Sequence, residues 1–146
     1  MNIGIIVYSQ TGNTLKAAES VKEALAAQGH SVSIERITAE GEVSPNTAVS
    51  LKSKPDPSKY DALVFASPVM GFALNPAMKA YLKQVKELGG KKAACFVVQG
   101  LPFNWMGGNQ ALKLMGELLK HKGADVCGTG VVYRSEKQAA TLCGAF

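Results

Sequence analysis

The chain has 146 residues, which is the length of one domain, and 47% of them are hydrophobic while 18% are charged. This composition supports a sizeable core and excludes an intrinsically disordered protein. The formal net charge is +5, but no stretch interleaves basic and aromatic residues, so a nucleic-acid partner is not expected.

The hydrophobic pattern predicts strands and helices in alternation along the chain. Continuous apolar runs predict strands covered on both faces, and apolar residues at spacings of three and four predict amphipathic helices. Asn75 and Pro76 match a helix N-cap followed by proline at the first helical position. In chain order we expect a strand over 2–8, a helix over 13–28 capped by Gly29, an edge strand over 31–37, a strand over 61–66, a helix over 76–88 ended by Gly89, a strand over 93–98, a helix whose apolar face runs from Ala111 to Leu119 and that closes before Gly123, and a strand over 126–133.

Residues 38–59 do not follow this alternation. They contain Pro45, Pro55 and Pro57 and show little periodicity. We expect at most a short helix around 47–52 in this region.

Strands that alternate with helices imply an α/β fold, with a parallel sheet, right-handed crossovers and helices on both faces. We expect one domain over residues 1–146, because no linker or repeat interrupts the pattern. In such a sheet a ligand lies beyond the carboxyl ends of the strands, at the switch point in strand order. The loops after the first, third and fourth strands should therefore converge; they are SQTGNT (9–14), SPVMGFALN (67–75) and QGLPFNWMGGN (99–109).

The first of these loops has the chemistry of a phosphate site without a basic side chain. It supplies hydroxyl groups and an amide, and Gly12 lets the backbone approach a ligand closely. It also opens a helix, whose first amides are unpaired at the positive end of the dipole. An ordinary N-cap turn is the alternative, because Ser, Thr and Asn are favoured there anyway. The loop is not a Walker A motif, since the ending GK[ST] is missing.

The segment SQTGNT after an apolar first strand resembles the phosphate loop of flavodoxins, whose pattern is (S/T)xTGNT. The resemblance covers the chain to about Tyr133. It implies a flavodoxin-like three-layer sandwich with a five-stranded parallel sheet in the order 2-1-3-4-5, an order taken from the family. It also implies FMN as the cofactor. The residues implied to hold the FMN phosphate are Ser9, Gln10, Thr11, Gly12, Asn13 and Thr14.

The other two loops are implied by the same resemblance to flank the flavin ring. A glycine such as Gly71 tolerates either peptide orientation, so its neighbouring carbonyl could accept a hydrogen bond from the flavin N5 after one-electron reduction. Phe103 or Trp105 could stack on the ring. The alternatives are a plain turn at Gly71 and packing of Trp105 on the adjoining helix. The implied residues are Ser67, Pro68, Val69, Met70, Gly71 and Phe72 in the second loop, and Gln99, Gly100, Leu101, Phe103 and Trp105 in the third.

No carboxylate pair, Ser-His-Asp set or metal-ligand spacing stands out, so we predict no catalytic or metal-ligating side chain. Any redox chemistry would then be that of the cofactor. His30 and His121 lie near helix ends and suit surface or capping roles. Of the three cysteines, we expect Cys95 and Cys127 to be buried, reduced thiols and Cys143 to be the more reactive.

Two classes of function remain open. The first is an FMN-binding electron carrier, or alternatively a small NAD(P)H-dependent FMN or quinone reductase; the second is a flavodoxin-like binding module without redox activity. The partner would be a redox protein or NAD(P)H, and the lysines at 79, 83 and 86, expected on one helix, are either solvated surface or a site that attracts an acidic partner.

The sequence also bears on where the protein is located in the cell and on its oligomeric state. No apolar run reaches the roughly 18 residues of a membrane-spanning helix, and the N-terminus lacks the pattern of a signal peptide, so we expect a cytoplasmic protein without membrane contact. After Tyr133 only a short tail remains to cover the sheet, which leaves a monomer or a homodimer open.

Overall fold

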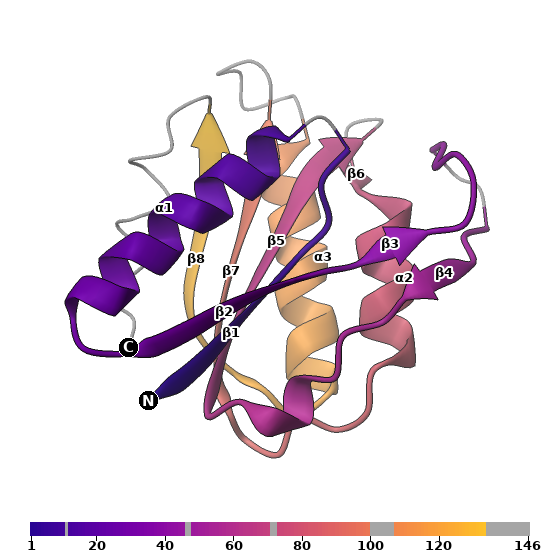
Figure 1. The fold of residues 1–146 in the computed structure, drawn as a ribbon. Coiled ribbons are helices and arrows are strands. Elements are labelled where there is room, and N and C mark those ends of the chain that lie inside the picture. The colour runs from indigo at the N-terminus through magenta and orange to yellow at the C-terminus, as the bar shows by residue number, and fades with distance from the viewer. Residues whose placement is uncertain (11, 46–47, 71–72, 100–106, 134–146) are drawn as a thin grey trace.

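Five parallel strands form one sheet in the computed structural model, which describes residues 1–10, 12–45, 48–70, 73–99 and 107–133. The sheet has the order β2-β1-β5-β7-β8, and the short β6 pairs antiparallel with the end of β5 (Figure 1). Its strands are β1 (Asn2–Val7), β2 (Ser31–Arg36), β5 (Ala62–Met70), β6 (Ala73–Leu74), β7 (Lys92–Gln99) and β8 (Asp125–Tyr133). Counting the parallel strands alone, this order is 2-1-3-4-5, so the predicted fold class and strand order are confirmed.

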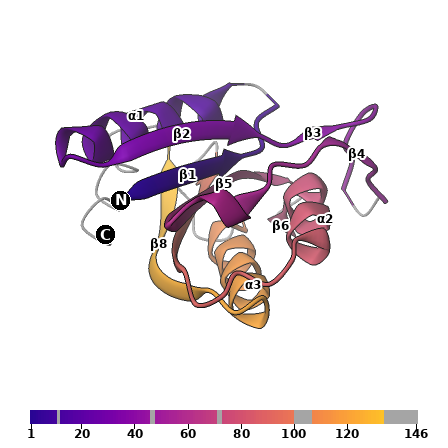
Figure 2. The same cartoon turned by 60° about the horizontal axis from the view of Figure 1, so that its bottom comes forward.

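Helices cover the two faces of the sheet. Helix α1 (Asn13–Ala27) lies on one face, and α2 (Pro76–Gln84) and α3 (Gly108–His121) lie on the other, as Figure 2 shows. The strand order reverses direction between β1 and β5, which is the switch point where ligands bind in such sheets. The carboxyl ends of β1, β5 and β7 lie at one edge of the sheet, the upper edge in Figure 1.

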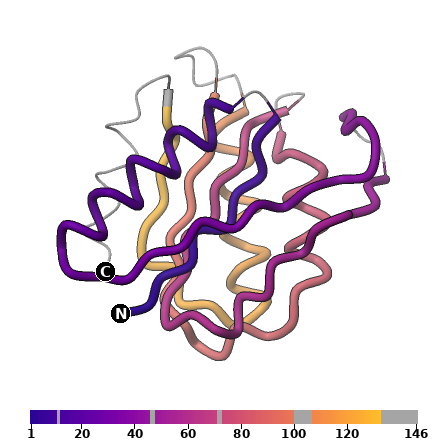
Figure 3. Tube along the Cα trace, viewed as in Figure 1, coloured from indigo at the N-terminus to yellow at the C-terminus, as the bar shows by residue number. Residues whose placement is uncertain are grey.

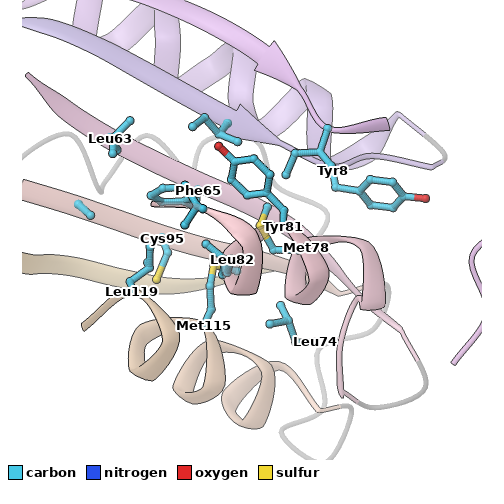
Figure 4. Packing of buried hydrophobic residues seen from close by; sticks show 14 of the residues in the cluster. Tyr8, Leu63, Phe65, Leu74, Met78, Tyr81, Leu82, Cys95, Met115 and Leu119 are labelled. Atoms are coloured by element: carbon cyan, nitrogen blue, oxygen red, sulfur yellow. The ribbon is translucent and has the colours of Figure 1, made fainter. Parts of the chain in front are cut away.

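The core has two halves because side chains alternate between the faces of each strand. On the face of α1, Ile3 and Ile5 pack with Val21 and Leu25. The other half lies between the sheet and α2 and α3, and Figure 4 shows its side chains pointing into the space between these layers. Among its labelled members are Leu63, Phe65, Met78, Leu82, Cys95, Met115 and Leu119. Residues Ile3 and Ile5–Val7 are 0% exposed, which confirms the predicted two-sided burial of the first strand.

Residues 48–52, the described part of the region where at most a short helix is expected, form no helix. Residues 48–50 are irregular and the chain continues into β4 (Leu51–Ser53), which pairs antiparallel with β3 (Thr38–Ala39). The Glu40 amide donates to the Ser50 carbonyl at 2.8 Å, so pairing distant in sequence replaces the local helix bonds. In the trace of Figure 3 this two-stranded arm extends from the sheet past α2. The arm is followed by the 3-10 helix η1 (Pro57–Lys59).

Helix α2 ends one turn earlier than its apolar pattern predicts. Val85 has ψ of 145°, which is extended backbone, although Val85 and Leu88 are both buried. The Leu88 amide donates to the carbonyl of Lys122 at 2.7 Å, so contacts with the end of α3 hold this segment outside the helix. Lys79 and Lys83 are therefore on α2, whereas Lys86 lies beyond its end.

The environments of the two described cysteines differ, and the prediction that both are buried is wrong for Cys127. Cys95 is 0% exposed, and burial raises the pKa of its thiol to about 12. Cys127 is exposed on β8. The pairing register there skips it, since Ala93 pairs with Val126 and Ala94 with Gly128. This bulge takes Cys127 out of the regular alternation between the faces. Cys143 is outside the described residues.

Candidate functional site

The turn from β1 into α1 is braced by the side chain of Ser9. Its Oγ accepts hydrogen bonds from the amide of Gly12 at 3.1 Å and from that of Leu15 at 3.4 Å. The sequence predicts Ser9 as a phosphate ligand, with an N-cap turn as the alternative. The structure gives its oxygen a capping role, and the hydroxyl proton remains as a donor for a ligand.

Gly12 opens α1 in a conformation that only glycine adopts easily. Its φ is 93°, Gly12 itself has no side chain that could cap the helix, and the first turn contains no acidic residue. A Cβ placed on Gly12 would have nothing within 4 Å, so the space beside this backbone is open. The positive end of the α1 dipole lies at this loop, which favours an anion there.

Arg36 reaches the same loop from the neighbouring strand. It ends β2, where it pairs in register with Val7, and its Nη2 donates to the main-chain oxygen of Ser9 at 3.3 Å. The site predicted from the sequence misses this residue, because it contains only the three loops, which have no arginine or lysine. A signal exists nevertheless: the order 2-1 puts the last residue of the second strand beside the first loop.

The remaining residues of the first loop differ in accessibility. Gln10 and Asn13 are exposed, whereas Thr14 is only 2% exposed and lies inside the junction of loop and helix. Tyr8 is buried beside them, and this burial raises the pKa of its hydroxyl, opposed by a hydrogen bond with the Gln10 side chain. Thr11 is outside the described residues.

The second loop begins later than predicted, because residues 67–70 continue β5. Val69 pairs with Leu74 and Met70 with Ala73, and Gly71 and Phe72 between them are outside the described residues. The last residue of β5 that pairs with β1 is Ala66. Pro68 lies beyond it and is tolerated, because fewer backbone hydrogen bonds to neighbouring strands are required there.

Four predicted positions in and beside the second loop can be placed in more detail. Ser67 is fully buried and its Oγ donates to the carbonyl of Pro68 at 3.1 Å, so it braces the strand end from inside. Val69 and Met70 are half-buried. Asn75 is confirmed as the N-cap of α2, since its Oδ1 accepts from the amide of Ala77 at 2.8 Å.

Only the ends of the third loop are described. Gln99 ends β7 at the same edge of the sheet and is 8% exposed. A Cβ on Gly108, the first residue of α3, would lie 2.4 Å from Gln99 Oε1 and 2.9 Å from Val131 Cγ1, so glycine lets the helix start close to the sheet. Gly100, Leu101, Phe103 and Trp105 are outside the described residues.

Other chemistry is sparse in the part of the chain that the structure describes. No group of three His, Cys, Asp or Glu side chains there could hold a metal ion, and no helix there is long and apolar enough to cross a membrane. The Nδ1 of His30 lies 3.2 Å from the N-terminal amino group at the surface, and His121 is exposed at the end of α3.

Solved structures with the same fold share little sequence with this chain. The oxidised flavodoxin 1 of Bacillus cereus is 16% identical with a TM-score of 0.72, over 99% of this chain and 96% of that one. A flavodoxin of Streptococcus pneumoniae TIGR4 is 18% identical with a TM-score of 0.72, over 99% of both chains. A flavoprotein of Lactobacillus acidophilus solved with FMN is 17% identical with a TM-score of 0.66, over 89% of this chain and 92% of that one.

The sequence itself gives a family match. No curated protein matched in a search with the whole chain. The sequence model described as "Flavodoxin domain" matches residues 4–104, which include most of β1, the first two loops, and β2, β5 and β7. With the strand order and the loop geometry, this match shows that the chain belongs to the flavodoxin-domain family.

Proposed function

We propose that this chain binds FMN at the carboxyl edge of its sheet and transfers electrons to or from a redox partner. The observation that carries the proposal is the start of α1: an N-cap glycine with φ of 93°, no acidic residue in the first turn and open space where a Cβ of that glycine would lie. Family membership supports the same ligand, as does the Lactobacillus acidophilus flavoprotein of the same fold that was solved with FMN.

The residues present fit a phosphate group. The first amides of α1, apart from that of Leu15, which already donates to Ser9, can donate to the phosphate oxygens, and the Ser9 hydroxyl has a proton to donate. Arg36 contributes a positive charge behind the loop without being part of it. FMN is therefore favoured over riboflavin, which lacks the phosphate, by at least about tenfold, because a hydrogen bond to a charged group contributes about 1.5–3 kcal/mol.

When bound, FMN supplies the one- and two-electron chemistry, and the protein supplies position and electrostatics. The described ends of the second and third loops, Met70 and Gln99, lie at the same edge as the phosphate loop and suit the sides of the ring. Gly71, Phe103 and Trp105 stay predicted ring contacts. The electron-transfer role rests on the family and on FMN binding together.

A matched pair of glycine variants tests the site. Gly12 and Gly29 both have φ of 93°, both have open space where a Cβ would lie, and they flank opposite ends of α1. Each change to alanine costs about 1–2 kcal/mol of stability, because a Cβ is disfavoured in the left-handed region. Gly12→Ala should in addition weaken FMN binding, measured by fluorescence quenching, whereas Gly29→Ala should bind FMN as the wild type does.

Two further readouts decide the class of function. A wild-type protein that binds neither FMN nor riboflavin contradicts the proposal and favours a binding module. Reversible reduction of the bound flavin without turnover of NAD(P)H supports a carrier, whereas steady oxidation of NAD(P)H with a quinone acceptor would replace the carrier by a reductase.

A further inference from the structure

A groove of about 450 Å³ lies beside the second loop and is separate from the phosphate loop. It is formed where α2, the end of β5, β6, α3 and the two-stranded arm meet. Its apolar floor includes Val49, Met70, Leu74 and Leu114, and its rim includes Lys79 and Lys83. Ala73 in the lining is exposed, so the groove is open to solvent.

The floor presents accessible apolar surface. Val49, Met70 and Leu114 pack against the hydrophobic core but are only half-buried, whereas Leu74 is almost fully buried. These side chains come from segments far apart in sequence, so the groove is a product of the tertiary fold. An apolar surface rimmed by polar groups is the usual form of a docking site.

The rim is positively charged. Lys79 and Lys83 are both exposed and stand one helical turn apart on α2, about 6 Å along the axis at 1.5 Å per residue. Neither forms an ion pair within the described residues, where the recorded pair joins Lys59 to Glu35. The described lining contains no carboxylate. A third cation is near, because the Nζ of Lys122 donates to the carbonyl of Lys83 at 3.1 Å.

We propose that this groove docks an acidic segment of a partner protein, with two carboxylates on Lys79 and Lys83 and one apolar side chain on the floor. Charge complementarity favours an acidic occupant. Because the groove is open and its floor is apolar, it suits a segment of a protein. Met70 and Ala73 flank the second loop, so the segment would lie beside the edge of the sheet where FMN is proposed. Only the redox role of the partner rests on the proposed function, since the docking itself does not need the flavin.

The test uses a defined probe: a blocked synthetic peptide with two glutamates one helical turn apart and a leucine between them. A second peptide carries lysines in place of the glutamates. Titration of isotope-labelled protein, followed by two-dimensional NMR, should give saturable shifts of the amides of Ala73, Ala80 and Leu114 with the acidic peptide alone. Affinity should fall at least about tenfold from 0.1 M to 1 M salt, as the Debye length drops from about 10 Å to about 3 Å.

Two variants separate docking from general attraction. Lys79→Glu with Lys83→Glu should lower the peptide affinity at least about tenfold. The control, Lys113→Glu with Lys120→Glu, changes the net charge equally at exposed positions on α3 and should lower it far less. Ala80→Trp leaves the charge unchanged and fills the groove, so it should also weaken binding while the spectrum keeps its folded dispersion.

Several results would overturn the proposal. They are equal binding of the acidic and basic peptides, no saturable shift with millimolar peptide, an equal loss in the α3 control, and unchanged binding in Ala80→Trp. Benzoate binding as tightly as the peptide would assign the groove to a small carboxylate instead. Failure of the wild type to bind FMN would remove the proposed function and leave the peptide result standing.

Discussion

Arg36 and Ser9, 27 positions apart in sequence, are joined by a hydrogen bond from the Arg36 guanidinium to the main-chain oxygen of Ser9 at 3.3 Å. Ser9 in turn accepts the amides of Gly12 and Leu15 through its hydroxyl. The end of β2 and the start of α1 are thus connected through one serine. This arrangement adds a positive charge to a loop that has none of its own.

Removing that charge should weaken the binding of the phosphate more than that of the ring. Arg36→Gln should lower FMN affinity by at most about 1 kcal/mol, about fivefold, because the attraction between exposed opposite charges contributes about 0.2–1 kcal/mol. Riboflavin affinity should change little, since riboflavin has no phosphate. Fluorescence titrations of both flavins give the comparison.

The control for this variant is Lys22→Gln, which removes an equal charge from an exposed position in the middle of α1. It should leave both affinities unaltered. An equal loss for FMN and riboflavin in Arg36→Gln would mean that the arginine only holds the loop in shape.

Ser9→Ala should destabilise the protein even without a ligand. It removes the oxygen that accepts the amide of Gly12 in the loop and that of Leu15 in the first turn of α1, and loss of a capping side chain costs about 0.5–2 kcal/mol. Urea denaturation of the flavin-free protein measures this change directly. An unaltered midpoint would show that solvent replaces the serine at no cost, and the capping role would be lost.

The elements that the sequence predicts well are those whose signal is local. The five strands and the cap at Asn75 follow from continuous apolar runs and from a side chain that accepts a bond two residues later. The errors arise where distant contacts win: Glu40 with Ser50 in the arm, and Leu88 with Lys122 after α2. Arg36 escapes prediction for the same reason, because its role depends on which strands are neighbours.

Gly4 should not tolerate a side chain. A Cβ there would lie 2.3 Å from Cδ2 of Tyr60, whose ring covers the strand at this point. Tyr60 cannot move away freely, since its hydroxyl donates to Glu35. Gly4→Ala should therefore cost about 1–3 kcal/mol of stability, the range of overpacked cores. Thermal unfolding measures the loss. The double variant Gly4→Ala, Tyr60→Ala should be more stable than Tyr60→Ala alone.

The same tyrosine should make the protein less stable in alkali. Burial, with the nearby carboxylate of Glu35, raises the pKa of Tyr60 from 10.0 to about 12. Between these values the unfolded chain has released the phenolic proton while the folded chain still binds it, so the folded state binds more protons. Titration of Tyr60 should therefore leave the free energy of unfolding unchanged below about pH 10 and should lower it as the pH rises towards about 12.

Urea titrations across this range should give a shallower decline in the free energy of unfolding for Tyr60→Phe than for the wild type. Some decline should remain in the variant, because burial also raises the pKa of Tyr81. Identical slopes in the two proteins would show that the Tyr60 proton is held no more tightly in the folded state than in the unfolded chain.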